Sequence, residues 1–399
     1  MPTPTAHAKL SASAAHRWLN CTAAPNYEAQ FPSGTSVYAE EGTLAHEFCE
    51  IYGRLIFGKI DSTDAEENCR GLKTHDLYNP EMEETAEFYA QQLWDASLSY
   101  SSPPAVFFEV RVDLSDWIPG GFGTCDFCMI GGDTLQIRDY KHGKGVRVDA
   151  EGNPQMRLYA LGALAKFRPI YGDAIKRVVT GIIQPRISED VSTEELTVEE
   201  LLAWGETVKP RAQAAYTGDG AEFHAGEWCK FCAGKAQCRV RADGYSALEE
   251  FAAMDLKDPR LSDAEIADLL TRGKGIKAWY EDLQEYAAEK LLAGGTLPGW
   301  KMVAGRSTRK FSDQDAALRA LEIAGYDEAI LYERKPLTLA QLEKQVGKKA
   351  FADICGDYIT KPPGSPTLVE ASDKRPPYNS AATEAEGLNG NNDNPDQVQ

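Results

Sequence analysis

The sequence of 399 residues lacks long apolar segments and an excess of positive charge. No run approaches the roughly 18 apolar residues of a membrane-spanning helix, and the first residues lack the apolar centre of a signal peptide. The sequence therefore predicts a cytoplasmic protein without a membrane partner. A formal net charge of −19 argues against indiscriminate nucleic-acid binding, because phosphate contacts require local positive potential.

Two further absences concern nucleotide binding and disulfides. The stretch "HGKG" at 142–145 lacks the G-x4-G-K-[ST] spacing of a phosphate-binding loop, and helicase motifs are missing. The nine cysteines, an odd number in an acidic chain, do not resemble the disulfide framework of a small secreted protein. Metal ligation or reduced thiols are the better interpretations.

The positive charges that are present gather in one window. Residues 138–186 hold ten Lys or Arg against four Asp or Glu. Such a window is either a set of solvated faces or a surface for the DNA backbone.

The periodicity of apolar residues predicts an α/β core with one buried sheet. Helices are expected first, then three strands separated by Gly, Pro and Asp turns, then a helix with Asn153 as N-cap and Pro154 in its first turn, and a further strand. The expected helices are 11–21, 41–58, 80–100 and 153–167, and the expected strands are 105–114, 121–130, 134–141 and 175–186. More helices and a cysteine cluster are expected at 190–248, a mainly helical accessory domain at 249–370, and a polar, disordered tail at 371–399.

A hairpin with acidic residues is predicted at 126–141, "DFCMIGGDTLQIRDYK". A turn of two or four residues centred between Gly132 and Asp133 puts residue i opposite residue 265 − i, so Asp126 faces Asp139. Alternation along a strand places Lys141 on the same face as Asp139 and Tyr140 on the other. Two opposed carboxylates and an ammonium group then converge.

This arrangement favours a divalent cation between the carboxylates. Carboxylate oxygens suit Mg²⁺ or Mn²⁺, and a lysine beside them can orient or deprotonate an attacking water. Taken alone, D-x-K is a weak motif that ordinary surface strands also carry. Further support comes from His46, a possible ligand on an early helix, and from Gln155 and Tyr159, which share one face of the following helix.

The stretch "WCKFCAGKAQC" predicts a metal centre with Cys229, Cys232 and Cys238 as ligands. The candidates for a fourth ligand are Cys21, Cys49, Cys69, Cys125, Cys128, Cys355 and His224. Cys125 and Cys128 are expected on opposite faces of a strand, so they cannot share a metal and are interpreted as core residues. Cys21 is preferred, because it would staple the N-terminus to a segment 208 residues later (229 − 21).

In this order, the segments "SASAAHRWLNC", "GTLAHEF", "GGFGTCDF", "IRDYKHGKG", "QMRLYALG" and "CKFCAGKAQC" resemble the PD-(D/E)XK nucleases. The resemblance covers residues 8–245 and is to the RecB-like, AddB-like branch with an iron–sulfur staple. It implies a restriction-endonuclease-like core, a mixed sheet flanked by helices, over residues 1–248. The C-terminal part resembles that of stand-alone proteins encoded by bacteriophages and acting in the bacterial host cell.

The resemblance implies a role for each motif residue. Asp126, Asp139, His46 and the carbonyl of Tyr140 would bind Mg²⁺ or Mn²⁺, and Lys141 would act on the water. Gln155 and Tyr159 would form the family's Q-x3-Y element, and a glutamate is common where Glu109 stands. Four cysteines would hold a [4Fe–4S] cluster, with zinc as the weaker alternative: Cys21, Cys229, Cys232 and Cys238.

The predicted function is that of a DNA exonuclease in phage recombination, replication or repair. DNA is the expected partner, with a single-strand-binding or annealing protein as a second candidate; nothing in the sequence shows a subunit interface. Two alternatives stay open, a non-catalytic DNA-binding scaffold with a vestigial nuclease site and a zinc-stabilised interaction protein.

Overall fold

The computed structural model describes residues 8–32, 37–252, 262–273, 275–303, 313–324, 331 and 337–359. The chain divides into two compact units, Met1–Val303 and Ala304–Gln399. The domain limits expected at residues 248 and 370 stay predictions, and the tail expected at 371–399 lies outside the described residues. The described helices of the second unit are α11 (Gln314–Ile323), α13 (Leu339–Val346), α14 (Lys348–Cys355) and the 3-10 turn η3 (Gly356–Tyr358).

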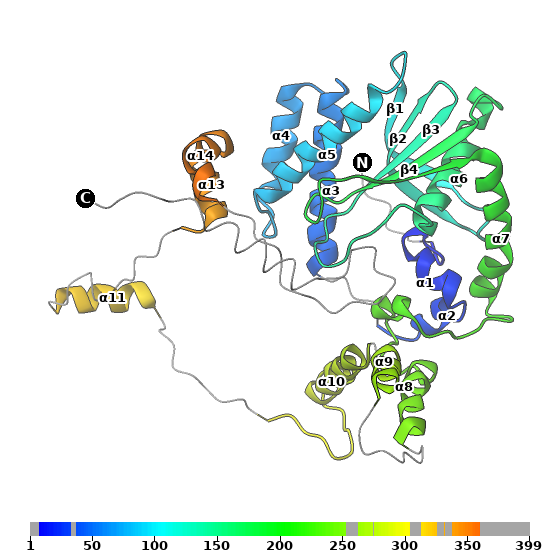
Figure 1. Ribbon diagram of the computed structural model, residues 1–399, viewed down its shortest axis with the longest axis vertical. Coiled ribbons are helices and arrows are strands. Elements are labelled where there is room, and N and C mark those ends of the chain that lie inside the picture. Colours follow the sequence, from blue (N-terminus) through cyan, green and yellow to red (C-terminus); the bar gives the residue numbers. More distant parts are fainter. Residues whose placement is uncertain are drawn as a thin grey trace, which may run out of the picture. The chain divides into compact units, whose positions relative to one another are not determined.

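A five-stranded sheet forms the centre of the first unit (Figure 1). Its strands follow one another in chain order: β1 (Ala105–Asp113), β2 (Phe122–Gly131), β3 (Thr134–Tyr140), β4 (Arg177–Ile183) and β5 (Ser192–Thr197). The pair β3 and β4 is parallel and the other neighbouring pairs are antiparallel, so the sheet is mixed.

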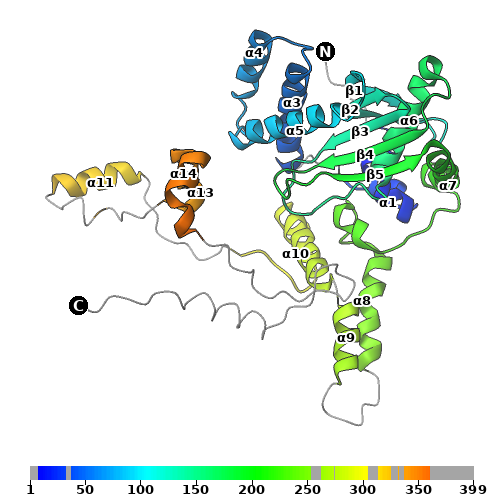
Figure 2. The ribbon, with the colours of Figure 1, turned by 45° about the horizontal axis from the view of Figure 1, so that its top comes forward.

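Helices cover both faces of this sheet (Figures 1 and 2). One face packs against α3 (Val37–Ile56), α4 (Ser62–Leu72) and α5 (Glu81–Ser97). The other packs against α6 (Pro154–Tyr171), α7 (Val198–Thr217), α1 (Ala15–Asn20) and the 3-10 turn η1 (Ala12–Ala14). The expected α/β class, with a mixed central sheet flanked by helices, is confirmed.

Strand β3 is the most buried strand, because it lies between β2 and β4 and under both helical layers. All seven of its residues are buried, including Arg138 and Asp139. The crossover from β3 to β4 runs through α6, whose first turn is fixed by the side chain of Asn153 accepting hydrogen bonds from the amides of Gln155 and Met156. The expected N-cap is confirmed, and it sets where Gln155 lies.

Strand β5 is a finding that the sequence did not predict, since residues 190–248 were expected to be helical. Its residues alternate between intermediate and exposed along "STEELT", as on an edge strand with one wet face. The segment is almost entirely polar, so its sequence shows no alternation of apolar and polar residues that would predict a strand.

A smaller helical group follows α7 in the first unit. It contains the 3-10 turn η2 (Glu227–Phe231), α8 (Arg239–Ala252), α9 (Asp263–Arg272) and α10 (Ile276–Leu292). Asp282 of α10 pairs with Lys235 at 2.7 Å and with Arg241 at 2.6 Å, which ties α10 to the cysteine-rich segment and α8. The short helix α2 (Ala24–Glu28) contacts the cysteine-rich segment through Glu28, which accepts a hydrogen bond from the amide of Ala233 at 3.0 Å. Within the described ranges, no helix has the length and apolar character needed to cross a membrane.

Candidate active site

The hairpin of β2 and β3 has the predicted register. Gly131 pairs with Thr134 across a loop of two residues, and Phe127 pairs with Arg138, whose numbers sum to 265. Gly132 has φ +56, a conformation that glycine adopts without a steric penalty. Asp126 therefore comes opposite Asp139 at the next position, and its Oδ2 accepts a hydrogen bond from the amide of Tyr140 at 2.9 Å.

Asp139, Lys141 and Gln155 form a closed polar triangle on the α6 side of the sheet. Lys141 Nζ lies 2.8 Å from Asp139 Oδ2 and donates to Gln155 Oε1 at 3.1 Å. Gln155 Nε2 donates to Asp139 Oδ1 at 3.1 Å. The ring of Tyr140 lies on the opposite face, in the core with α3 and α5, as alternation predicted.

The charges of the triangle depend on its burial. Asp139 is 2% exposed, and burial raises the pKa of its carboxyl, with Lys141 opposing this change. Burial lowers the pKa of Lys141, but the neighbouring Asp139 and Asp126 more than offset this, so its pKa lies above its usual range. Lys141 is therefore a cation in the protein as it stands.

His46 joins this site from α3. Its Nδ1 lies 3.3 Å from Asp126 Oδ2, and its ring meets that of Tyr140 edge-on at 5.3 Å. Burial opposes the charge on both groups; nevertheless their mutual attraction raises the pKa of His46 and lowers that of Asp126. The sequence predicts a helix at His46, and the fold brings this residue to Asp126.

Tyr159 lies one helical turn after Gln155, and it is buried, 8% exposed. Its ring fills the space beside Gly123 on β2, where an added Cβ would come within 2.7 Å of the ring. Gly123 is thus needed for the close approach of α6 to the strand that carries Asp126. Tyr159 closes one side of the site rather than facing open solvent.

The residues of this site fit a divalent cation. Asp139 Oδ2 is buried and accepts no hydrogen bond of good geometry; its contact with Lys141 is an ion pair. Two facing carboxylates are sufficient protein ligands for Mg²⁺, which keeps several waters. Among the described residues, no three His, Cys, Asp or Glu side chains form a ready-made cage, so the fit rests on the two aspartates. Tyr140 meets Asp126 through its amide, and the expected role of its carbonyl stays a prediction.

Glu109 is a third carboxylate near this pair, which sequence reasoning noted without a role. It is the one non-glycine residue in the described part of the chain with positive φ, at +50°, and the ladder of β1 and β2 skips its position. Although the residue is exposed, desolvation by the surrounding protein, then Asp126 and Glu50, raise the pKa of its carboxyl to about 8. A strained backbone beside a charged cluster is typical of functional sites.

The predicted orientation of Cys125 and Cys128 is wrong. Both are fully buried and belong to the same core on the α6 face, and contact with Cys128 adds to the burial that raises the pKa of Cys125. The regular alternation of β2 breaks at Asp126, opposite Glu109, where the ladder is interrupted. Their interpretation as core residues is confirmed.

A second candidate site gathers the other predicted cysteines, which line one small cavity: Cys21, Cys229, Cys232 and Cys238. Cys21 Sγ accepts from the amide of His224 at 3.5 Å, and Cys229 Sγ accepts from that of Gly226 at 3.4 Å. Burial first, and then the nearby Cys229 and Cys238, raise the pKa of Cys21. Among the described residues these four thiols do not form a ready-made metal cage, but thiols around one cavity with amides donating to sulfur are the donor set that a metal–sulfur centre uses.

Among the alternative fourth ligands, His224 lines the same cavity as the four cysteines. Cys49 and Cys69 belong to the core under α3 and α5, and Cys355 belongs to the second unit. The imidazole of His224 pairs with Glu222 at 3.0 Å and is half exposed. Cys21 is therefore the cysteine that the fold places beside the cluster motif.

The chain matches a family model described as "Protein of unknown function (DUF2800)" over residues 7–376. This chain belongs to the DUF2800 family. The matched residues include those of both candidate sites.

Three solved structures are similar to this DUF2800 chain in part. The "Crystal structure of SSO0001" has 10% identity, covers 57% of this chain and 96% of its own, and has a TM-score of 0.24. The alkaline exonuclease LHK-Exo from Laribacter hongkongensis has 13% identity, covers 44% of this chain and 85% of its own, and has a TM-score of 0.23. The complex of LHK-Exo with dAMP has 15% identity, covers 45% of this chain and 93% of its own, and has a TM-score of 0.23. TM-scores this low carry no argument, and the function proposed below rests on the geometry of the site.

The cations of the predicted basic window are not all exposed. Arg138 is buried, 7% exposed, and burial lowers its pKa to about 10. Arg157 pairs with Glu194, and Arg177 pairs with Asp133 and Glu195 at the far end of β4. Arg186 is buried between two glutamates. The lysines of the window that lie exposed are Lys144, Lys166 and Lys176.

Proposed function

We propose that this DUF2800 protein is a Mg²⁺-dependent deoxyribonuclease that hydrolyses phosphodiester bonds. The observation that carries the proposal is the triangle of Asp139, Lys141 and Gln155 facing Asp126 on the neighbouring strand. Asp139 Oδ2 lies 2.8 Å from Lys141 Nζ, and Asp126 comes opposite on the neighbouring strand, so two carboxylates and an ammonium group converge. A cation and a phosphate substrate would satisfy such a site.

Each residue of the triangle has a role in this proposal. Asp126 and Asp139 would hold Mg²⁺ or Mn²⁺, which when bound neutralises phosphate charge and acidifies water. Lys141 would orient the attacking water or help to deprotonate it. Gln155 would keep Lys141 and Asp139 at a fixed separation, and His46, whose Nδ1 lies 3.3 Å from Asp126 Oδ2, would be a further ligand of the cation.

We further propose that the four cysteines hold a [4Fe–4S] cluster with a structural role, zinc being the weaker alternative. The cavity they line joins two distant segments of chain. Arg17 donates to the carbonyl of Phe231 at 3.1 Å, and Glu28 accepts from the amide of Ala233 at 3.0 Å. A centre at this point would close the nuclease domain as a clasp.

The finer assignments rest on the resemblance of the motifs. They are exonucleolytic action on DNA ends in phage recombination, replication or repair, in the cytoplasm of a bacterial host, with a single-strand-binding or annealing protein as a second partner. Lys144 lies exposed three residues after Lys141 and would contact the DNA backbone.

The test uses anaerobically purified protein on end-labelled linear duplex and single-stranded DNA with Mg²⁺, Mn²⁺ or EDTA. Asp139→Asn and Lys141→Ala should abolish a metal-dependent cleavage that wild type shows. Asp133→Asn makes the same charge change at an exposed position of the hairpin loop and should cleave like wild type. DNA binding without cleavage under every metal would support the scaffold alternative instead.

A further inference from the structure

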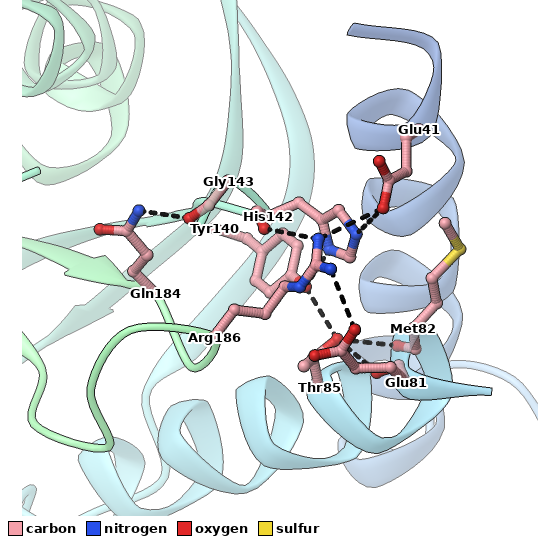
Figure 3. A network of polar contacts seen from close by, with 9 residues as sticks. All are labelled: Glu41, Glu81, Met82, Thr85, Tyr140, His142, Gly143, Gln184 and Arg186. Carbon is pink, nitrogen blue, oxygen red and sulfur yellow. Dashed lines mark hydrogen bonds and ion pairs between the residues drawn. The ribbon is translucent and has the colours of Figure 1, made fainter. Parts of the chain in front are cut away.

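Arg186, just after β4, is a buried cation that joins three separate segments (Figure 3). Its side chain is 7% exposed. Its guanidinium lies 3.2 Å from Glu41 of α3 and 3.0 Å from Glu81 of α5, and it donates to the carbonyl of His142 at 3.2 Å. A buried guanidinium is stable only when its partners stay in place, so these contacts fix the three segments together.

The same network holds the residue on each side of Lys141. His142 Nε2 lies 3.1 Å from Glu41 Oε1, the oxygen that also meets Arg186. His142 Nδ1 lies 2.9 Å from the hydroxyl of Tyr140, which donates to Thr85 of α5 at 2.8 Å. Tyr140 and His142 are thus anchored on the α3 and α5 side of the sheet (Figure 3).

The loop that follows β3 is held by a residue that comes directly after β4. Gln184, two residues before Arg186, donates to the carbonyls of Gly143 at 2.6 Å and Val146 at 2.9 Å. Its Oε1 accepts from the amide of Val148 at 3.0 Å. Residues 184–186 therefore define the path of the chain directly after Lys141.

We infer that Arg186 is a positioning residue for Lys141, an inference that rests on the proposed nuclease function. By holding the carbonyl of His142 and the carboxylate of Glu41, it fixes the backbone that follows Lys141. The side chain of Lys141 can then reach Asp139 and Gln155 on the opposite face in one arrangement. Arg186 itself meets neither Asp126 nor Asp139, and its burial keeps it from the DNA.

Three variants separate positioning from simple stability. Arg186→Gln removes the charge and most of the contacts, and Arg186→Lys keeps the charge with a single donor group. The double variant Arg186→Gln/Glu81→Gln restores the local charge sum but not the contact with His142. Arg177→Gln is the matched control, because Arg177 also pairs with two carboxylates but lies exposed at the opposite end of β4.

The measurements are kcat and KM for DNA cleavage, Kd for DNA in Ca²⁺, melting temperature, and hydrogen exchange of peptides covering 139–148. Arg186→Gln should lower kcat about tenfold to a hundredfold with KM and Kd nearly unchanged, because small misplacements of a catalytic group have effects of this size. Arg186→Lys should be intermediate. The double variant should regain melting temperature but not kcat, and both Gln variants should exchange faster at 139–148.

Recovery of both kcat and melting temperature in the double variant would show that Arg186 acts only through charge balance, which would overturn the inference. Unchanged exchange at 139–148 in Arg186→Gln would overturn it as well. The exchange measurement needs no cleavage. Wild-type protein that cuts no DNA would therefore refute the proposed function, while the exchange result would still decide whether Arg186 orders the segment around Lys141.

Discussion

Gln155, on α6, donates its amide Nε2 to Asp139 Oδ1 of β3 at 3.1 Å, across the junction of helix and sheet. Its Oε1 accepts from Lys141 on the same strand. One neutral side chain therefore sets the distance between a buried carboxylate and a partly exposed ammonium group, and its own place is set by the N-cap at Asn153.

Replacing Gln155 with alanine should lower kcat for DNA cleavage by about ten- to a hundredfold, the usual effect of losing a residue that orients a metal ligand. Binding of DNA in Ca²⁺ should change little, because Gln155 is not proposed to carry phosphate. Gln213→Ala, at an exposed position of α7, is the control. A Gln155→Ala protein with wild-type kcat would refute the orienting role.

Glu109 should make stability in EDTA depend on pH. Its carboxyl titrates near 4.5 in the unfolded chain but at about 8 in the folded one. The folded state thus keeps a proton that the unfolded state releases, so this group destabilises the fold progressively as pH rises from about 4.5 to about 8. Glu109→Gln should remove the effect and unfold at higher temperature than wild type at pH 8, but not at pH 4.

The size of the Glu109 effect is expected to be about 1 kcal/mol or less, because the residue is exposed and solvent screens its charge. Thermal unfolding of both proteins from pH 4 to pH 9 measures it. Glu66→Gln, at an exposed position of α4, should show no pH-dependent difference from wild type. A constant difference between Glu109→Gln and wild type across this range would contradict the raised pKa.

Cys21→Ser should remove the metal centre and loosen the clasp. Anaerobic wild-type protein should be brown, absorb near 400 nm and contain iron and sulfide, whereas the variant should be colourless. Loss of a link that closes a loop of 208 residues (229 − 21) should lower the free energy of unfolding by roughly 2–5 kcal/mol.

Cys355→Ser, in the second unit, is the control for that experiment and should keep the colour. Colourless wild-type protein with stoichiometric zinc would replace iron–sulfur by zinc at the same four residues. A Cys232→Ala protein that stays folded and fully active would refute a structural centre of either kind.

Lys144→Ala should weaken DNA binding two- to fivefold and reduce the slope of log Kd against log salt by about one, as expected for one phosphate contact. The kcat at saturating DNA should be unchanged, since Lys144 lies outside the triangle. Lys59→Ala, at an exposed position after α3, is the control. An unchanged salt slope in Lys144→Ala would show that the DNA follows another path.

Much of the candidate site follows from the sequence alone. The turn residues between β2 and β3 and the period of two along each strand placed Asp126 opposite Asp139 and Lys141 beside it, and the Asn153 cap placed Gln155 at the start of its helix. These relationships depend on residues close in sequence and on backbone geometry that they fix locally.

Other features were decided only by the tertiary structure. Arg186 is buried because Glu41, 145 residues away, and Glu81, 105 residues away, come to meet it. Arg138, which belongs to the predicted basic window, is buried because both faces of its strand are covered. Cys125 and Cys128 share one face because the ladder breaks opposite the strained Glu109. Burial and pairing are properties of segments that meet in space, and a pattern along one segment does not contain its partners.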